Sequence, residues 1–159
     1  MRTTEYIELD AQLGNLSGVI SPARYLAVLP SLADELPPEA RAFATAPEHY
    51  DFHGKRCVKD LEVQDVRTVG ADDQQMEIGF RHNCWKHGED LVVRYTGVTG
   101  FDAGDVQDDN WADLGTVILD EVLPHRSGCS HEIAFRNGSL TVVCRDLVAT
   151  WTETDCPDE

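Results

Sequence analysis

Three cysteine and histidine side chains near the C-terminus are spaced so that one face of a β-hairpin would carry all of them. The runs CSHEIAFR and SLTVVCRD flank Asn137-Gly138, a dipeptide typical of a two-residue hairpin turn. A turn at these residues places His131 opposite Cys144, with Cys129 one pleat further along the same face. Thiolates and neutral imidazoles are zinc ligands. The pattern therefore indicates a candidate zinc site at Cys129, His131 and Cys144.

The same face also suits a core without metal, because Ile133, Phe135, Leu140 and Val142 share it. Buried cysteines often behave as small hydrophobic residues, and hydrogen bonds can satisfy a buried histidine. A zinc site needs a fourth ligand, for which the sequence offers Cys84, His82, His87 or Asp146. We favour the core and expect no cofactor, with zinc as the alternative. The opposite face, which carries Glu132, Arg136, Thr141 and Arg145, should be exposed to water.

A second concentration of such side chains is the segment FRHNCWKHGED, with His82, Cys84 and His87. The runs QQMEIGFRH and DLVVRYTGV predict neighbouring antiparallel strands, so the residues between them form a connection in which Gly88 can take a left-handed conformation. The spacing H-x-C-x-x-H could hold a metal, but it is not a specific motif. We interpret the segment as a turn.

Motifs for catalysis are missing from the sequence. It contains no nucleophile elbow, glycine-rich phosphate loop or dinucleotide fingerprint. Asp120 and Glu121 are adjacent carboxylates, but neighbours on a strand point to opposite faces and do not form an acid–base pair without a bulge. We therefore favour a protein that is not an enzyme, and an enzyme of unusual design is the alternative.

The acidic stretch FDAGDVQDDNWADLG surrounds Trp111, and no lysine or arginine lies between Arg94 and Arg126. Its spacing does not match a helix-loop-helix calcium loop. An irregular calcium site, or a solvated connection with its tryptophan packed inward, are alternatives. Loops often carry binding, carboxylates steer basic partners, and tryptophan often anchors interfaces. We predict a partner-binding surface that comprises Asp102, Asp105, Asp108, Asp109, Trp111 and Asp113.

The overall charge limits the choice of partners. The chain has 159 residues, of which 29 are acidic and 13 basic, for a formal net charge of −16. Such a field repels nucleic acids and anionic lipid surfaces and attracts basic proteins. No window has the length and apolarity of a membrane span or signal peptide, and the five cysteines are unevenly spaced. We expect a cytoplasmic protein with reduced thiols that binds neither nucleic acid nor membrane.

The elements that must position these residues change character along the chain. In residues 1–50, ISPARYLAVLPSLADEL predicts a helix that starts near Ser21 and is broken or kinked at Pro30, and PPEARAFATA predicts another that starts at Pro38. The preceding run EYIELD could be a lone strand. Residues 57–152 contain short alternating runs typical of strands, with connections too short for crossover helices.

These patterns predict an α+β fold, with short N-terminal helices packed on a mainly antiparallel sheet of about six or seven strands. Residues 1–152 should form a single domain, with a helical part at 1–50 and a β part at 57–152, and residues 153–159 an acidic tail. Strand order and oligomeric state are left open.

The sequence therefore favours a non-enzymatic acidic binding protein that recognises a basic protein partner, as an inhibitor or immunity protein would. The alternative is a metalloprotein with zinc at the cysteine and histidine site, either structural or catalytic. A third possibility is a small-molecule pocket inside a curled sheet.

Overall fold

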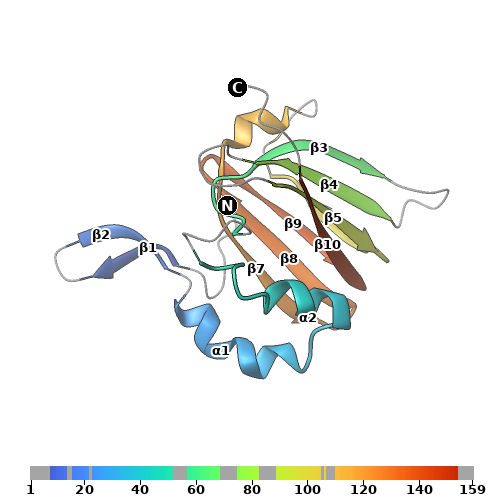
Figure 1. Ribbon diagram of the computed structural model, residues 1–159, viewed down its shortest axis with the longest axis horizontal. Coiled ribbons are helices and arrows are strands. Elements are labelled where there is room, and N and C mark those ends of the chain that lie inside the picture. Colours follow the sequence, from blue (N-terminus) through green and yellow to red (C-terminus); the bar gives the residue numbers. More distant parts are fainter. Residues whose placement is uncertain are drawn as a thin grey trace.

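Two four-stranded antiparallel sheets make up most of the computed structural model, which describes residues 8–13, 16–21, 23–51, 57–68, 75–82, 89–104, 106 and 110–153 (Figure 1). The first sheet has the order β10-β5-β4-β3, from β3 (Glu62–Thr68), β4 (Met76–Arg81), β5 (Glu89–Thr96) and β10 (Asp146–Glu153). The second has the order β6-β9-β8-β7, from β6 (Gly100–Asp102), β7 (Val117–His125), β8 (Gly128–Phe135) and β9 (Gly138–Cys144).

The remaining described elements lie mostly before the sheets in the chain. A separate hairpin of β1 (Glu8–Leu13) and β2 (Leu16–Ser21) extends away from the sheets in Figure 1. It is followed by α1 (Ala23–Ala33) and α2 (Pro38–Ala44), and a short 3₁₀ helix, η1 (Trp111–Leu114), precedes β7. No helix in the described part of the chain has the length and apolar character needed to cross a membrane.

The α+β class and the antiparallel pairing are confirmed, but the expected single sheet is wrong. The strands divide into two sheets and a hairpin, and η1 lies outside the N-terminal helical part. The alternation of apolar and polar residues along a strand shows which face of that strand is buried. Strands of a single sheet and strands of two sheets that face each other show the same alternation, so the pattern does not give the number of sheets around the core. The second helix begins at Pro38 as predicted, whereas α1 continues through Pro30 as one helix.

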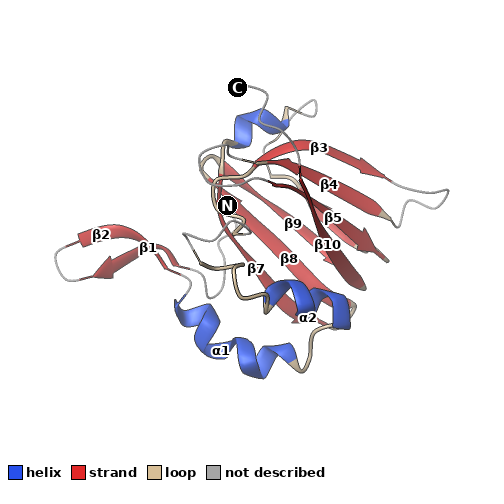
Figure 2. Ribbon diagram, viewed as in Figure 1, coloured by secondary structure: helices blue, strands red, loops and turns tan. Residues whose placement is uncertain are grey.

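The two sheets face each other across one hydrophobic core. The first sheet contributes Ile78, Phe80, Leu91, Val93 and Leu147, and the second contributes Val122, Ile133, Leu140, Val142 and the two cysteines of the β8–β9 hairpin. Among the described strands, β10 and β7 are edge strands of different sheets, and α2 contacts both of them. The helix therefore closes one open side of the sandwich, as the arrangement of helices and strands in Figure 2 shows.

The β8–β9 hairpin has a different register from the one predicted. Phe135 pairs with Gly138, so the turn residues are Arg136 and Asn137. The backbone N–H of Arg136 donates to Thr116 O (3.0 Å), and that of Asn137 donates to Leu114 O (3.0 Å). These contacts with the segment after η1 are not encoded in the turn sequence itself.

The new register moves each partner on β9 by two residues. His131 stands opposite Val142, and Cys129 stands opposite Cys144. Because a shift of two positions preserves the face of a strand, all these side chains still point into the core as predicted.

The opposite face of the hairpin is less exposed than the sequence predicts. Arg136 and Arg145 are exposed and Thr141 is half-buried, but only 3% of the surface of Glu132 is accessible. The expectation that Glu132 faces water is therefore wrong. It pairs across β7–β8 with Glu121, which is also buried. The pattern of residues within one strand does not show whether another segment of the chain packs over its outer face.

A carboxylate from β10 holds the beginning of α2. Pro37 precedes the helix and has no side-chain acceptor for the first N–H groups. Instead Asp146 Oδ1 accepts a hydrogen bond from Ala40 N (2.9 Å), and its Oδ2 lies 3.4 Å from Glu39 N. A negative group at this end of a helix also interacts favourably with the helix dipole. Asp146 thus fixes α2 against the edge of the first sheet.

We expect the Asp146→Ala variant to lose about 1–2 kcal/mol of unfolding free energy, since the helix then lacks an N-terminal cap. Urea denaturation followed by circular dichroism would measure the loss. Glu153→Ala, an exposed change at the other end of β10, should stay within about 0.5 kcal/mol of the wild type. Equal stabilities of the Asp146 and Glu153 variants would contradict the capping role.

Candidate functional site

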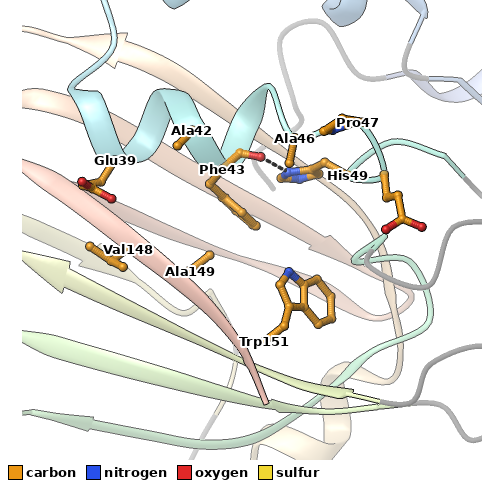
Figure 3. A pocket seen from close by; sticks show the side chains of 10 residues that line it. Glu39, Ala42, Phe43, Ala46, Pro47, His49, Val148, Ala149 and Trp151 are labelled. Carbon is orange, nitrogen blue, oxygen red and sulfur yellow. Dashed lines mark hydrogen bonds between the residues drawn. The ribbon is translucent and has the colours of Figure 1, made fainter. Parts of the chain in front are cut away.

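A pocket of about 280 Å³ lies between α2 and β10 (Figure 3). In this view Phe43 extends from the helix and Trp151 from the strand toward the space between them. The lining consists of Glu39, Ala42, Phe43, Ala46, Pro47, Glu48, His49, Val148, Ala149 and Trp151. The small alanine side chains leave the space open, and most of the wall is apolar. The pocket is therefore suited to an apolar group.

Behind the pocket lies a buried cluster centred on Asp120 of β7. One carboxylate oxygen, Oδ1, is 2.6 Å from His49 Nε2, and the other, Oδ2, is 2.6 Å from His131 Nε2. At most 2% of the surface of any of the three residues is accessible. His131 continues the chain of hydrogen bonds to β5, where Tyr95 OH lies 2.7 Å from His131 Nδ1. A single carboxylate thus links the segment after α2 with both sheets.

The β7–β8 hairpin positions two members of this cluster. Asp120 pairs with Ile133 and Val122 with His131, so both functional side chains lie on the core face two positions apart. Gly128, at the start of β8, has a φ of +138°, and a Cβ there would collide with the backbone carbonyl of Arg145. Glycine is therefore required at this position for the hairpin to form as observed.

Hydrogen-bond directions determine how many protons the cluster holds. His49 Nδ1 lies 2.7 Å from the carbonyl oxygen of Phe43, which can only accept a hydrogen bond. Its Nε2 faces the Asp120 carboxylate, which in its ionised form also only accepts. His49 therefore carries protons on both nitrogens and forms a buried ion pair with Asp120.

His131 is held between Asp120 and Tyr95. Its Nε2 lies 2.6 Å from Asp120 Oδ2, and its Nδ1 lies 2.7 Å from the hydroxyl oxygen of Tyr95, a group that can both donate and accept a hydrogen bond. Burial raises the pKa of Tyr95 well above its usual value, which keeps the hydroxyl proton on the oxygen.

Two further tyrosines satisfy backbone carbonyls of the edge strand β7. Tyr50 OH donates to Asp120 O (2.9 Å) and Tyr25 OH donates to Val122 O (2.6 Å). Burial, followed by the charge of Asp120, raises the pKa of both hydroxyls. Burial alone would also raise the pKa of Asp120, but the imidazoles of His49 and His131 outweigh it and lower that pKa below its ordinary value.

The cluster positions the surrounding elements and is closed to ligands. The cavity beside Asp120 and His131 has a volume of only about 10 Å³, at most the space of one water molecule. Of the cluster, only His49 lines the larger pocket. Because both its nitrogens donate to other groups, the ring contributes surface to that pocket and no free base.

The predicted zinc ligands are only partly brought together. The thiols of Cys129 and Cys144 are 3.7 Å apart, whereas His131 uses both nitrogens in the Asp120 cluster. The hydrogen bond with Cys144, then burial, raises the pKa of Cys129 and keeps it protonated, although zinc binds the thiolate. Within the described ranges no three His, Cys, Asp or Glu side chains are grouped to hold a metal ion.

The two proposed fourth ligands that the structure describes have other hydrogen-bond partners. Asp146 caps α2, and His82 Nδ1 lies 2.6 Å from Asp90 Oδ1. Cys84 and His87 lie outside the described residues. The predicted turn around them is therefore untested.

The predicted partner-binding surface includes Trp111, and the structure places Phe101, which the sequence did not indicate, beside it. Asp102 and Asp113 are exposed and Trp111 is half-buried. Phe101, from the edge strand β6, is 40% exposed, and its ring centroid lies 6.4 Å from that of Trp111. Asp105, Asp108 and Asp109 lie outside the described residues. Asp102, the next residue after Phe101, was part of the predicted surface, but the alternation of apolar and polar residues did not indicate that Phe101 is exposed.

The Asp120 cluster was also missed, for a different reason. Asp120 was considered only together with Glu121, and the register places the two on opposite faces as expected. Its true partners are His49, 71 positions away, and His131, 11 positions away. No local pattern connects residues so far apart in the chain.

Comparison of the sequence with protein-family models gave no match, and no curated protein matched it significantly. Function is therefore argued from the geometry of the pocket, the cluster and the acidic surface.

We expect Asp120→Asn to lower the unfolding free energy by about 3–5 kcal/mol, because it leaves the buried His49 cation without its counter-charge. Urea denaturation would measure this change. Asp90→Asn is the matched control, since Asp90 also pairs with a histidine but is 23% exposed, and its loss should be about 1 kcal/mol or less. In wild-type protein, ¹⁵N spectra should show His49 with two protonated ring nitrogens. A neutral His49 would contradict the ion pair.

The lowered pKa of Asp120 also predicts how stability depends on pH. Ionised Asp120 stabilises the fold fully above its unfolded pKa of about 3.9, and this contribution is lost as pH falls through the lower folded value. Below about pH 4 the wild type should therefore lose up to about 1.4 kcal/mol per pH unit more than Asp120→Asn does. Urea titrations between about pH 2 and 6 would compare the slopes. Parallel curves for the two proteins would show that Asp120 does not contribute.

Proposed function

We propose that the chain is a non-enzymatic acidic binding protein of the cytoplasm that recognises a basic protein partner, in the manner of an inhibitor or immunity protein. The surface proposed for this contact comprises Phe101 together with Asp102, Asp105, Asp108, Asp109, Trp111 and Asp113. The observation that carries the proposal is the aromatic pair of the exposed Phe101 and the half-buried Trp111, on a segment that also carries the exposed carboxylates of Asp102 and Asp113.

An aromatic surface with carboxylates at its rim matches the chemistry of lysine and arginine. The guanidinium or ammonium group can lie over an aromatic ring while a carboxylate pairs with its charge. Aromatic side chains also contribute much of the binding energy at the centres of protein interfaces. The net charge of −16 would increase the rate at which a basic partner meets this surface.

The described part of this surface is supported by hydrogen bonds that reduce the entropy lost on binding. Asp102 Oδ1 accepts the backbone N–H of Gly104 (2.8 Å), which orders the turn after β6. The Asn137 side chain lies 3.3 Å from Asp113 O and connects η1 to the β8–β9 turn. An ordered surface of this kind favours tight binding.

The partner would be captured with tagged protein from the native host at low salt, eluted by raising the salt concentration, and identified by mass spectrometry. With the purified partner, Phe101→Ala should weaken binding about tenfold or more, as expected for a central aromatic contact. Asp102→Asn with Asp113→Asn should mainly slow association, and the effect should shrink as salt screens the charges. Asparagine keeps the oxygen that accepts the Gly104 N–H.

Asp34→Asn with Glu35→Gln is the matched control, because it changes the net charge equally at two exposed residues after α1. It should leave the affinity within about twofold of the wild type. If Phe101→Ala and the aspartate variant bind as tightly as this control, the surface assignment is wrong. Retention of acidic or neutral proteins alone, unaffected by salt, would contradict recognition of a basic partner.

A further inference from the structure

The pocket between α2 and β10 is large enough to admit a single long side chain. Its volume of about 280 Å³ is just below the range of roughly 300–1,000 Å³ that is usual for small-molecule sites. Ala42 and Ala46 line the helix side and Ala149 lines the strand side, so a methylene chain would meet small apolar groups on both sides. Trp151 offers the face or edge of an indole.

The charge of the lining favours a cation. Glu39 and Glu48 contribute carboxylates, and no lysine or arginine is among the described residues that line the pocket. His49 is the one lining residue with a positive charge in that set, but Asp120 neutralises it. Both N–H groups of His49 are directed to Phe43 O and Asp120 rather than to a ligand. With the charge of His49 balanced by Asp120, Glu39 supplies a negative charge at the pocket wall.

The pocket is held open by contacts that do not depend on a ligand. Asp146 fixes the start of α2 on β10, and His49 fixes the segment after the helix through Asp120 on β7. Val148 of β10, which lines the pocket, is 39% exposed, so the pocket is open to solvent on this side. A preformed pocket loses little free energy to reorganisation when a ligand binds.

We infer that this pocket receives a lysine or arginine side chain of the basic partner, with the methylene chain against Ala42 and Ala149 and the charged end near Glu39. This inference rests on the proposed function and adds a second contact to it, separate in sequence from the Phe101–Trp111 surface. Lysine and arginine side chains pack their methylene chains along apolar surface and keep the charged end at a polar or acidic group.

The test uses a five-residue peptide of alternating threonine and valine around a central lysine, acetylated and amidated, with a norleucine peptide as its uncharged counterpart. Titration of ¹⁵N-labelled full-length protein should shift the Trp151 indole and the Ala149 amide with the lysine peptide, and the norleucine peptide should bind at least threefold more weakly. Ala42→Trp, an exposed position on the pocket wall, should abolish these shifts by filling the space. Glu39→Gln should weaken lysine-peptide binding about two- to fivefold.

The matched control is Glu62→Gln, an equal charge change at an exposed residue of β3, on the opposite edge of the same sheet. It should leave binding of the lysine peptide unchanged. Equal binding of the norleucine peptide, shifts that persist in Ala42→Trp, an equal effect of Glu62→Gln, or no saturable binding at millimolar peptide would each overturn the inference.

The variants also separate this inference from the proposed function. Phe101→Ala should leave binding of the lysine peptide to the pocket unchanged while it weakens binding of the intact partner. If the peptide fails to bind the pocket but Phe101→Ala still weakens the partner complex, only the pocket inference is wrong. If the peptide binds the pocket but no basic partner exists, the proposed function fails and the pocket remains a site for alkylammonium groups.

Discussion

The carboxylate of Asp120 is the constraint on which the arrangement of the layers depends. It lies on an edge strand of one sheet, accepts hydrogen bonds from His49 and His131, and is connected to Tyr95 of the other sheet through His131. A charge buried this deeply is stable only where it is paired and hydrogen-bonded. The chain must therefore bring three distant segments together in one geometry, which makes the cluster a strong determinant of a unique fold.

The position of α2 follows from this cluster and from Asp146. Asp146 holds the first turn of the helix on β10, and His49 anchors the residues that follow its last turn. Between these two attachments the helix lies across the open side of the sandwich, and its small side chains leave a gap above β10. The pocket is thus a consequence of how the helix is fastened at both ends.

Charged side chains on the first sheet form ion pairs with one another. On the first sheet, Glu77 accepts hydrogen bonds from Arg94 Nε (2.7 Å) and Arg67 Nε (3.1 Å). These bonds, that of Arg94 first, lower the pKa of Glu77 and keep it ionised. Two of the exposed arginines are in this way balanced by a carboxylate of the same sheet.

The sequence by itself determined the α+β class, the antiparallel strands, the start of α2 at Pro38 and the inward face of the β8–β9 hairpin, because each depends on neighbours in the chain. Period-two alternation and a proline at a first helical turn are local signals. Only the tertiary structure decided that the strands form two sheets, that the hairpin turns at Arg136 and Asn137, and that Glu132 is buried. It also decided that Asp120 joins His49 and His131. Those outcomes depend on contacts between segments that are far apart in the chain. The free energy of such contacts cannot be predicted from a local pattern of residues.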